Sequence, residues 1–440
     1  MLTNLHFDEK TQYLFPGNRG ANQVHDLSLD DLFQLMAETG FQDEEYTKII
    51  NAIVAQRDAD VQAGKPTGSG WELGELAVMY SGGAVVAYPN GMRFITFPSK
   101  RHLFRGENQK YPATIPSLRR DLDRFTDDRE KELNFAVAQL RKWQFSELIW
   151  NINIVPYWEA KLSEVNYDAL AQHYGFKTCL LDLTSDLKTA LFFATCKYKS
   201  ETDSFLPLTQ EDIDKSEETK YGYIFHAPSR QIDFLIGSSL KAMKLTSNAN
   251  KTCYWQNGDM DGIAFQIGYQ PLYRCHYQSG YIYPMRYEKP LQENSVFEKL
   301  RFKQSVFLSN HVYEMMDKGK KVFPNEGISE IRSIVDELKY SVVFSREQLD
   351  CIFNVIGINR KIFPFYEDLL RAINGFHVKE GVIRIVDGPV TPTIPSDLLK
   401  IVNSHYDGKD LLKVIGGFRQ TDFDRMIREK RCRELFGTLI

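Results

Sequence analysis

Arg105 and Gly106 stand at the end of a short strand predicted over residues 101–106 (RHLFRG). The planar guanidinium of an arginine can hold a phosphate at two points. The glycine that follows would let a ligand approach the backbone closely. An anion site at this strand end is one interpretation, and an ordinary surface salt bridge is the other.

A second strand end carries Asp182, Thr184 and Ser185. TCLLDL (178–183) is apolar at nearly every position, which is typical of a strand covered on both faces. Leu187, Ala190, Leu191 and Ala194 then repeat at helical spacing. The three polar residues therefore lie between a buried strand and a helix, where they form either a ligand site or a helix N-cap.

Two further segments bring polar groups into apolar surroundings. His173 and Tyr174 end a helix predicted over 167–174, so the histidine either complements the helix dipole or lies near Asp182. Glu298 and Gln304 belong to VFEKLRFKQSVFL (296–308), where Gln304 shares the parity of Phe302 if the segment is one strand. A buried glutamine needs partners, so we expect a site role or a backbone clamp.

Several other chemistries find no support in the sequence. It has no G-x-G-x-x-G before a helix, no P-loop, no G-x-S-x-G and no H-E-x-x-H. His102, His173 and His276 stand far apart, and the six cysteines include no C-x-x-C pair. We therefore expect no metal, no zinc site and no disulfide framework.

The composition is that of an ordinary soluble protein. The chain has 440 residues, 25% of them charged, and a net charge of −4, which gives no general attraction to nucleic acid or membranes. A chain of this length exceeds one ordinary core, so two or three domains are expected. No apolar run is long enough to span a membrane, and the N-terminus lacks the pattern of a signal peptide, so we expect a cytoplasmic protein.

The elements that must position these residues suggest a three-part chain. Residues 1–70 predict a helical region, with a capping box at Ser28 and Asp31 and a second helix over 43–62. Residues 71–375 form the central domain, which includes a hairpin over 84–97, a long helix over 126–157 and an exposed loop over 200–220. Residues 376–440 predict a helical tail, beginning with a helix over 395–406.

The central motifs resemble the FRG domain family. FRG (104–106) with PSLRR (116–120) is similar to the opening signature of that family, and QHYGFKTCLLDLTSDLKTALFFA (172–194) is similar to its central motif. RFKQSVF (301–307) and GINRKIFPFYEDL (357–369) resemble its closing elements, although Ser305 replaces a glycine. The resemblance covers roughly residues 95–375.

A more distant likeness is to ADP-ribosyltransferases, which implies an α+β fold with a mixed, mostly antiparallel split sheet, flanking helices and helical extensions at both ends. That likeness implies NAD as substrate, with Arg105, Gly106 and Tyr174 among the cofactor-binding residues. It also assigns the nicotinamide ribose contacts to Thr184 and Ser185. The implied catalytic residues are His173, Asp182, Gln304 and Glu298; because a glutamine cannot act as a general base, one of the other three must do so.

Two functions follow as hypotheses. The first is an NAD-dependent mono-ADP-ribosyltransferase, or an NAD glycohydrolase, within the glycosyltransferases, which acts on a protein or nucleic-acid acceptor in the setting of a bacterial toxin or antiviral defence. The extensions could then hold an inhibitor or antitoxin. The second is a non-enzymatic recognition module for nucleic acid or protein, in which the aromatic-rich segment 250–290 forms a groove and Lys299, Arg301 and Lys303 contact phosphates.

Overall fold

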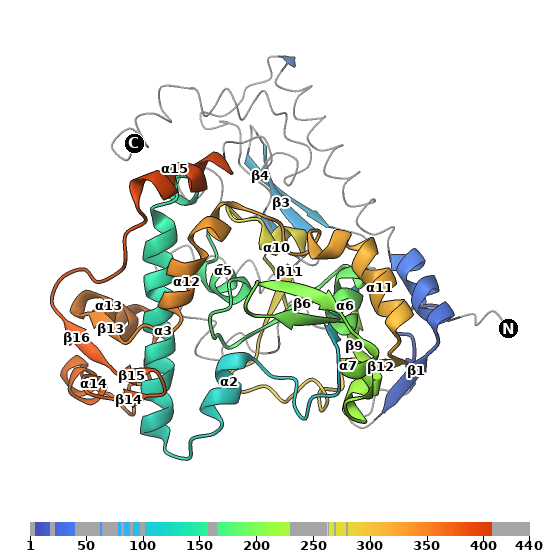
Figure 1. Cartoon of the computed structure of the whole chain (residues 1–440), viewed down its shortest axis with the longest axis horizontal. Helices are drawn as coiled ribbons and strands as arrows, with labels where there is room; N and C mark the ends of the chain where they lie inside the picture. Colours follow the sequence, from blue (N-terminus) through green and yellow to red (C-terminus); the bar gives the residue numbers. More distant parts are fainter. Residues whose placement is uncertain are drawn as a thin grey trace.

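The structure is a computed structural model. It describes residues 5–17, 23–39, 62–63, 78–80, 83–88, 91–96, 102–156, 165–228, 262, 264–267, 270–278 and 280–406. The architecture is α+β, as expected. A mixed sheet lies at the centre, with helices packed on it and at its side (Figure 1).

The main sheet contains seven strands among the described residues, and all neighbours are antiparallel except β1 and β12. In spatial order the strands are β1 (Val24–Leu27), β12 (Glu298–Lys303), β9 (Tyr221–Pro228), β5 (His102–Glu107), β6 (Leu180–Thr184), β11 (Gly280–Pro284) and β10 (Phe265–Gln266). β5 and β6 pair through a single residue pair, Phe104 with Thr184. The sheet is therefore nearly split at the two strands that carry the sequence motifs.

Alternation along the strands gives the sheet two apolar faces. Phe104 packs with helix α6 (Leu187–Thr195), whereas Leu103 packs with Phe225 and Tyr281 on the other face. Helix α11 (Val306–Met315) and the helix over residues 29–39 complete the α6 side. Arg105 follows the parity of Leu103, and Gly106 follows that of Phe104.

Further helices pack around the long helix α3 (Asp128–Trp150), which lies beside the sheet in Figure 1. The other helices are α2 (Ser117–Leu122), α5 (Tyr167–His173), α7 (Gln210–Asp214), α10 (Arg274–Tyr277), α12 (Arg332–Leu338), α13 (Arg346–Cys351), α14 (Tyr366–Ile373) and α15 (Ser396–Ser404). Short 3-10 helices cover Glu218–Lys220, Asp317–Gly319 and Gly327–Ile331, and a π-helix covers Ile352–Ile356.

Four small sheets complete the described elements. They are β2 (Val78–Tyr80) with β3 (Gly83–Tyr88) and β4 (Gly91–Thr96), β7 (Cys196–Lys199) with β8 (Ser204–Pro207), β13 (Val343–Ser345) with β16 (Arg384–Val386), and β14 (His377–Val378) with β15 (Gly381–Val382). The β3–β4 hairpin confirms the prediction over 84–97.

Local capping signals are confirmed where the structure describes them. Ser28 and Asp31 bond reciprocally at the start of the helix over 29–39, and Ser345 and Gln348 form a capping box on α13. Gly357 adopts a left-handed conformation (φ 84°) after the helical segment, as its predicted stop role requires.

Some expectations for the elements were wrong. The segment 200–220 is not a loop, because it contains β8 and α7. The segment 296–308 is not one strand, since β12 ends at Lys303 and the side chain of Ser305 caps α11. In the segment 296–308, apolar periodicity could not separate β12 from α11, because the strand and the helix share one short apolar stretch.

Elements from both ends of the described chain pair with the central region. β1, from the N-terminal region, extends the main sheet by pairing with β12. In the tail, β16 pairs with β13, and Tyr406 donates a hydrogen bond to Glu326. The second N-terminal helix and the helices predicted after residue 406 lie outside the described residues.

Candidate functional site

Arg105 and Asp182 meet where β5 and β6 separate. Arg105 Nη1 donates to the main-chain carbonyl of Asp182 at 2.9 Å, and its Nε donates to Glu107 at 3.1 Å. The side chain of Arg105 remains 25% exposed, and that of Asp182 36% exposed. Both side chains are therefore partly exposed, although strand alternation directs Arg105 to the face of Leu103 and the Asp182 carboxylate to the opposite face.

Phe104 and Gly106, the other members of the tripeptide, have packing roles. Phe104 is buried in the apolar layer under α6. A Cβ atom at Gly106 would overlap the backbone carbonyl of Ala190 in α6, so only glycine lets the helix come this close. Gly106 therefore positions α6, and Arg105 is the one member of the tripeptide left open to a ligand.

A chain of hydrogen bonds orients the Asp182 carboxylate. Gln172 Nε2 donates to Asp182 Oδ2 at 3.2 Å, Thr178 Oγ1 donates to Gln172 Oε1, and Leu180 N donates to Thr178 Oγ1 at 3.1 Å. These residues come from the end of α5, the turn after it and the start of β6. Hydrogen bonds within the central motif therefore fix the orientation of the Asp182 carboxylate.

His173 lies behind that carboxylate. Its Nε2 is 3.9 Å from Asp182 Oδ1, and its side chain is 2% exposed. Both atoms are buried and lack a hydrogen-bond partner among the described residues. Burial lowers the pKa of His173, and the Asp182 carboxylate opposes that effect, so the ring is neutral near pH 7.

Thr184 and Ser185 stand beside this pair. Thr184 Oγ1 donates to the carbonyl of Gln278 at 2.7 Å and accepts from Asp186 N at 3.0 Å. The Thr184 hydroxyl therefore joins β6 to Gln278, just before β11, and to the start of α6. Ser185 is buried.

Tyr174, expected among the cofactor-binding residues, points into a buried cluster instead. Its hydroxyl donates to Glu326, which also accepts from Tyr273 N at 2.8 Å and from Tyr406 Oη at 3.1 Å. Burial and the Glu326 carboxylate raise the pKa of Tyr174 well above its usual value. The hydroxyl is thus bonded to Glu326, which also binds Tyr406 after α15.

Gln304 is a backbone clamp, the second of its two expected roles. Its Nε2 donates to the carbonyls of Ala194 at 2.7 Å and Asn108 at 3.1 Å. These contacts join the ends of α6, β5 and β12. Gln304 is 3% exposed, so the structure does not present it to a substrate.

Glu298 is also removed from the Arg105 and Asp182 pair. It accepts from His226 Nδ1 at 2.7 Å, from Phe15 N at 2.6 Å and from Leu14 N at 3.0 Å, and its side chain is fully buried. His226 in turn bonds His102 at 2.9 Å. Glu298 therefore holds the N-terminal segment on the sheet, and its carboxylate oxygens are used in hydrogen bonds with the protein.

The surroundings of Arg105 include groups that the sequence reasoning missed. Glu107 accepts from Thr114 Oγ1 at 2.9 Å, and Thr114 is held by Gln292. Glu107 lies two residues after Arg105 on one strand face, a period-2 spacing that the sequence does contain. Thr114 and Gln292 carry no comparable signal, because 178 residues separate them.

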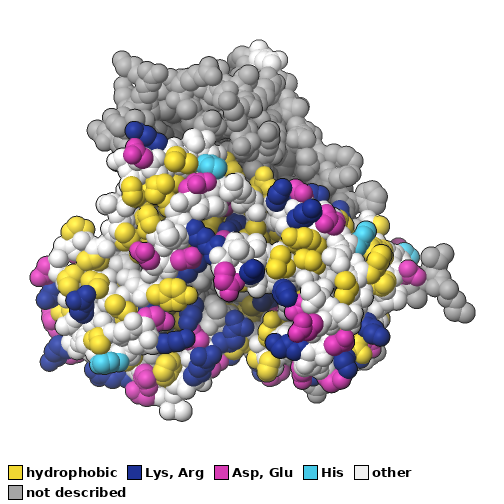
Figure 2. Space-filling model, in the orientation of Figure 1, with side chains coloured by type: hydrophobic (Ala, Val, Ile, Leu, Met, Phe, Trp, Pro, Cys, Tyr) yellow, Lys and Arg dark blue, Asp and Glu magenta, His cyan; other side chains and the backbone are white. Residues whose placement is uncertain are grey.

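Basic side chains gather near this part of the molecule. Figure 2 shows Lys and Arg side chains beside a hollow in the middle of the face drawn, over the region of α2. Arg120 of α2 is exposed, and its charge, like that of Arg105, acts on the hydroxyl of Tyr111. Arg120, the second arginine of the PSLRR signature, therefore lies in the same electrostatic neighbourhood as Arg105.

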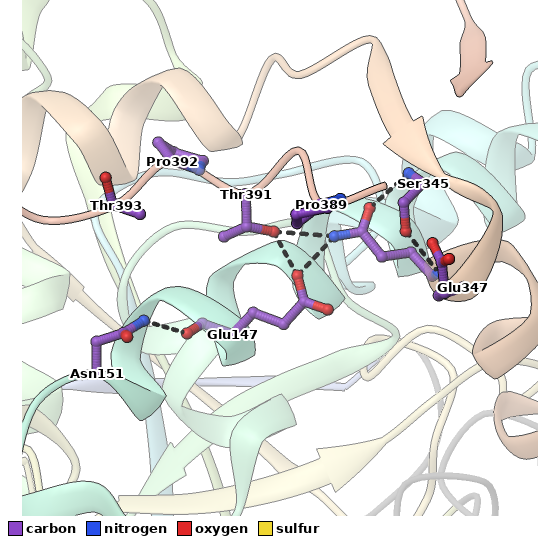
Figure 3. A pocket seen from close by; sticks show the side chains of 9 residues that line it. Glu147, Asn151, Ser345, Glu347, Pro389, Thr391, Pro392 and Thr393 are labelled. Atoms are coloured by element: carbon purple, nitrogen blue, oxygen red, sulfur yellow. Dashed lines mark hydrogen bonds between the residues drawn. The ribbon is translucent and has the colours of Figure 1, made fainter. Parts of the chain in front are cut away.

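A separate pocket of about 410 Å³ lies away from these residues (Figure 3). It is formed by the end of α3, the start of α13 and the segment 389–393. Gln348 Nε2 and the hydroxyl of Thr391 both donate to Glu147 there. None of the site residues expected from the sequence lines this pocket.

The described side chains do not support the aromatic groove of the second hypothesis. Tyr281 and Tyr283 are buried in the sheet core, and Lys299 is buried as well. Arg301 pairs with Asp26 at 2.6 Å and 3.1 Å. The part of the segment before residue 262 lies outside the described residues.

Neither a metal-binding cluster nor a membrane-spanning helix occurs among the described residues. No cluster of three or more His, Cys, Asp or Glu side chains there is arranged to hold a metal ion. No described helix combines the length and apolar character that crossing a membrane requires.

Comparison with known proteins identifies one family. The model of the FRG domain matches residues 100–203, which contain β5, α2, α3, α5, β6 and α6. No curated protein and no solved structure matches the chain. The match confirms the resemblance to the FRG domain family for residues 100–203, the segment that carries both Arg105 and Asp182.

Proposed function

We propose that this protein uses NAD⁺ as substrate and transfers its ADP-ribosyl group to a macromolecular acceptor, or to water. The observation that carries the proposal is the contact between Arg105 and Asp182 at the split in the sheet. Both groups reach solvent, and both belong to the segment similar to the FRG domain.

The two side chains suit the two ends of an ADP-ribosyl donor. A guanidinium held in place by Glu107 and a carbonyl can bind the pyrophosphate through its remaining N–H groups. A fixed carboxylate can bind ribose hydroxyls and stabilise the positive charge that develops on the sugar as nicotinamide leaves. This chemistry needs positioning and charge, and it needs no metal.

Of the catalytic candidates named from the sequence, the proposal assigns the role of the acid to Asp182. Glu298 and Gln304 are occupied by structural hydrogen bonds, and Asp182 is the candidate carboxylate that is open to solvent. Asp182 therefore takes the role that the distant likeness to ADP-ribosyltransferases gives to a residue of a third strand. As part of the same proposal, we infer that the main sheet is a split sheet of the ADP-ribosyltransferase type.

The test is release of nicotinamide from NAD⁺ by the native protein, by Arg105→Ala and by Arg301→Ala. Arg301 is the matched control because it also lies on a strand of the sheet and pairs with a carboxylate, Asp26. We expect release by the native protein and by Arg301→Ala, and loss of release in Arg105→Ala with folding retained. Equal release by all three proteins would reject the assignment of Arg105.

A further inference from the structure

His173, the buried histidine behind Asp182, has no role in the proposed function. The hydroxyls of Tyr174, Thr178 and Thr184 are bonded to protein partners. His173 Nε2 and Asp182 Oδ1 instead face each other at 3.9 Å, and each lacks a partner among the described residues. Two buried polar atoms left without partners need an explanation, since each costs free energy to desolvate.

We propose that His173 is the positioning residue of the site, which receives through Asp182 the proton that the acceptor releases. This inference rests on the proposed function. The distance of 3.9 Å is too long for a hydrogen bond, and an approach of about 1 Å brings the two atoms to bonding range. Neither atom has to give up a partner to make that approach.

The proton balance of the reaction calls for such a group. The bond between the ribose C1′ and the nicotinamide nitrogen breaks, and its electron pair leaves with neutral nicotinamide. The acceptor's oxygen or nitrogen forms the new bond to C1′ and loses one proton. That single proton passes to the Asp182 carboxylate, and the carboxyl transfers it from Oδ1 to His173 Nε2, so Asp182 returns to the ionised form beside an imidazolium.

The charged groups around His173 suit a ring that starts neutral. Burial and the Arg274 guanidinium, which donates to the His173 carbonyl at 3.0 Å, both disfavour protonation of the ring. The Asp182 carboxylate favours it, and Gln278 adds a weaker hydrogen-bonding effect in the same direction. The buried Cys275 thiol also lies within the field of Asp182, and burial raises its pKa well above the usual value, so it stays neutral.

The first measurement does not depend on activity. His173 is titrated by NMR, through its ring carbon and proton signals, in the native protein and in Asp182→Asn. If the two side chains are coupled, loss of the carboxylate moves the pKa of His173 further below its ordinary value. An unchanged titration of His173 would refute the pairing whatever the protein does to NAD⁺.

The second measurement uses turnover. His173→Gln keeps a hydrogen-bonding side chain but cannot take up a proton, so we expect nicotinamide release about 10- to 100-fold slower. In the native protein the rate should rise with pH as His173 loses its proton, and His173→Gln should lose that dependence. A variant with the native rate and pH profile would overturn the role of His173. Absence of turnover in the native protein, with the NMR coupling intact, would count against the proposed function instead.

Discussion

Arg105 Nη1 lies 2.9 Å from the main-chain carbonyl oxygen of Asp182, across the only residue-pair connection between β5 and β6. A ladder hydrogen bond would normally satisfy that carbonyl, so the arginine takes the place of a strand neighbour. The Arg105 side chain thereby bridges β5 and β6 beyond their one paired position. The predictions below follow from this relationship and from the packing around it.

The first prediction concerns the geometry of the guanidinium. Arg105→Lys keeps the charge, but an ammonium cannot bind Glu107, the Asp182 carbonyl and a pyrophosphate in one plane. We expect the KM for NAD⁺ to rise about 10- to 100-fold, as loss of a charge-assisted hydrogen bond implies. Steady-state nicotinamide release measures this, and a KM unchanged from the native value would contradict it.

The second prediction concerns the carboxylate. Asp182→Asn still accepts the hydrogen bond from Gln172, so the fold should persist while the charge is lost. We expect kcat to fall about 100- to 1,000-fold, with little change in KM, because the charge acts chiefly in the transition state. Asp186→Asn is the matched control, since asparagine preserves the N-cap of α6. Equal losses of kcat in the two variants would argue against a special role for Asp182.

The third prediction tests the packing of α6. In Gly106→Ala the new methyl group meets the Ala190 carbonyl, so α6 must shift away from β5. We expect the free energy of unfolding to fall by about 3 kcal/mol, at the upper end of the usual cost of overpacking. In Gly17→Ala nothing lies within 4 Å of the added atom, and its stability should stay near native. Chemical denaturation of both variants measures the two changes in the free energy of unfolding, and equal changes would contradict the prediction.

The fourth prediction concerns pH and Glu298. Burial acts to raise the pKa of Glu298, but hydrogen bonds from His226 and the backbone of Phe15 and Leu14 outweigh it and lower the pKa below its ordinary 4.5. A lowered pKa in the folded state means that the ionised carboxylate stabilises the fold above pH 4.5. That contribution is lost as the pH falls through the folded value.

Glu298→Gln should therefore be less stable at pH 7 by about 3 kcal/mol, as expected when hydrogen bonds to a buried charged group are weakened. It should also lose less stability than the native protein between pH 5 and the acid range. Glu293→Gln, which changes an exposed carboxylate, should follow the native curve. Parallel curves for Glu298→Gln and the native protein would show that the carboxylate does not stabilise the fold.

The sequence by itself determined most of the local structure of the described residues. The apolar run before Asp182 predicted β6, the repeat from Leu187 predicted α6, and Ser345 with Gln348 predicted the start of α13. These signals are local, because caps and apolar spacings act over a few residues. The motif pattern also placed Arg105 and Asp182 in one candidate site, and the two residues are in contact.

Tertiary structure alone decided which polar residues remain open to a ligand. Glu298 finds Leu14 and Phe15 across more than 280 residues, and Gln304 finds Ala194 across 110. Side-chain type and spacing along the chain cannot show whether a partner so distant in sequence will satisfy a carboxylate or an amide. Burial of a polar group depends on those partners, because an unsatisfied group is costly in the core. For that reason only the folded chain could separate Asp182, which is held but exposed, from residues of similar chemistry whose hydrogen bonds hold the protein together.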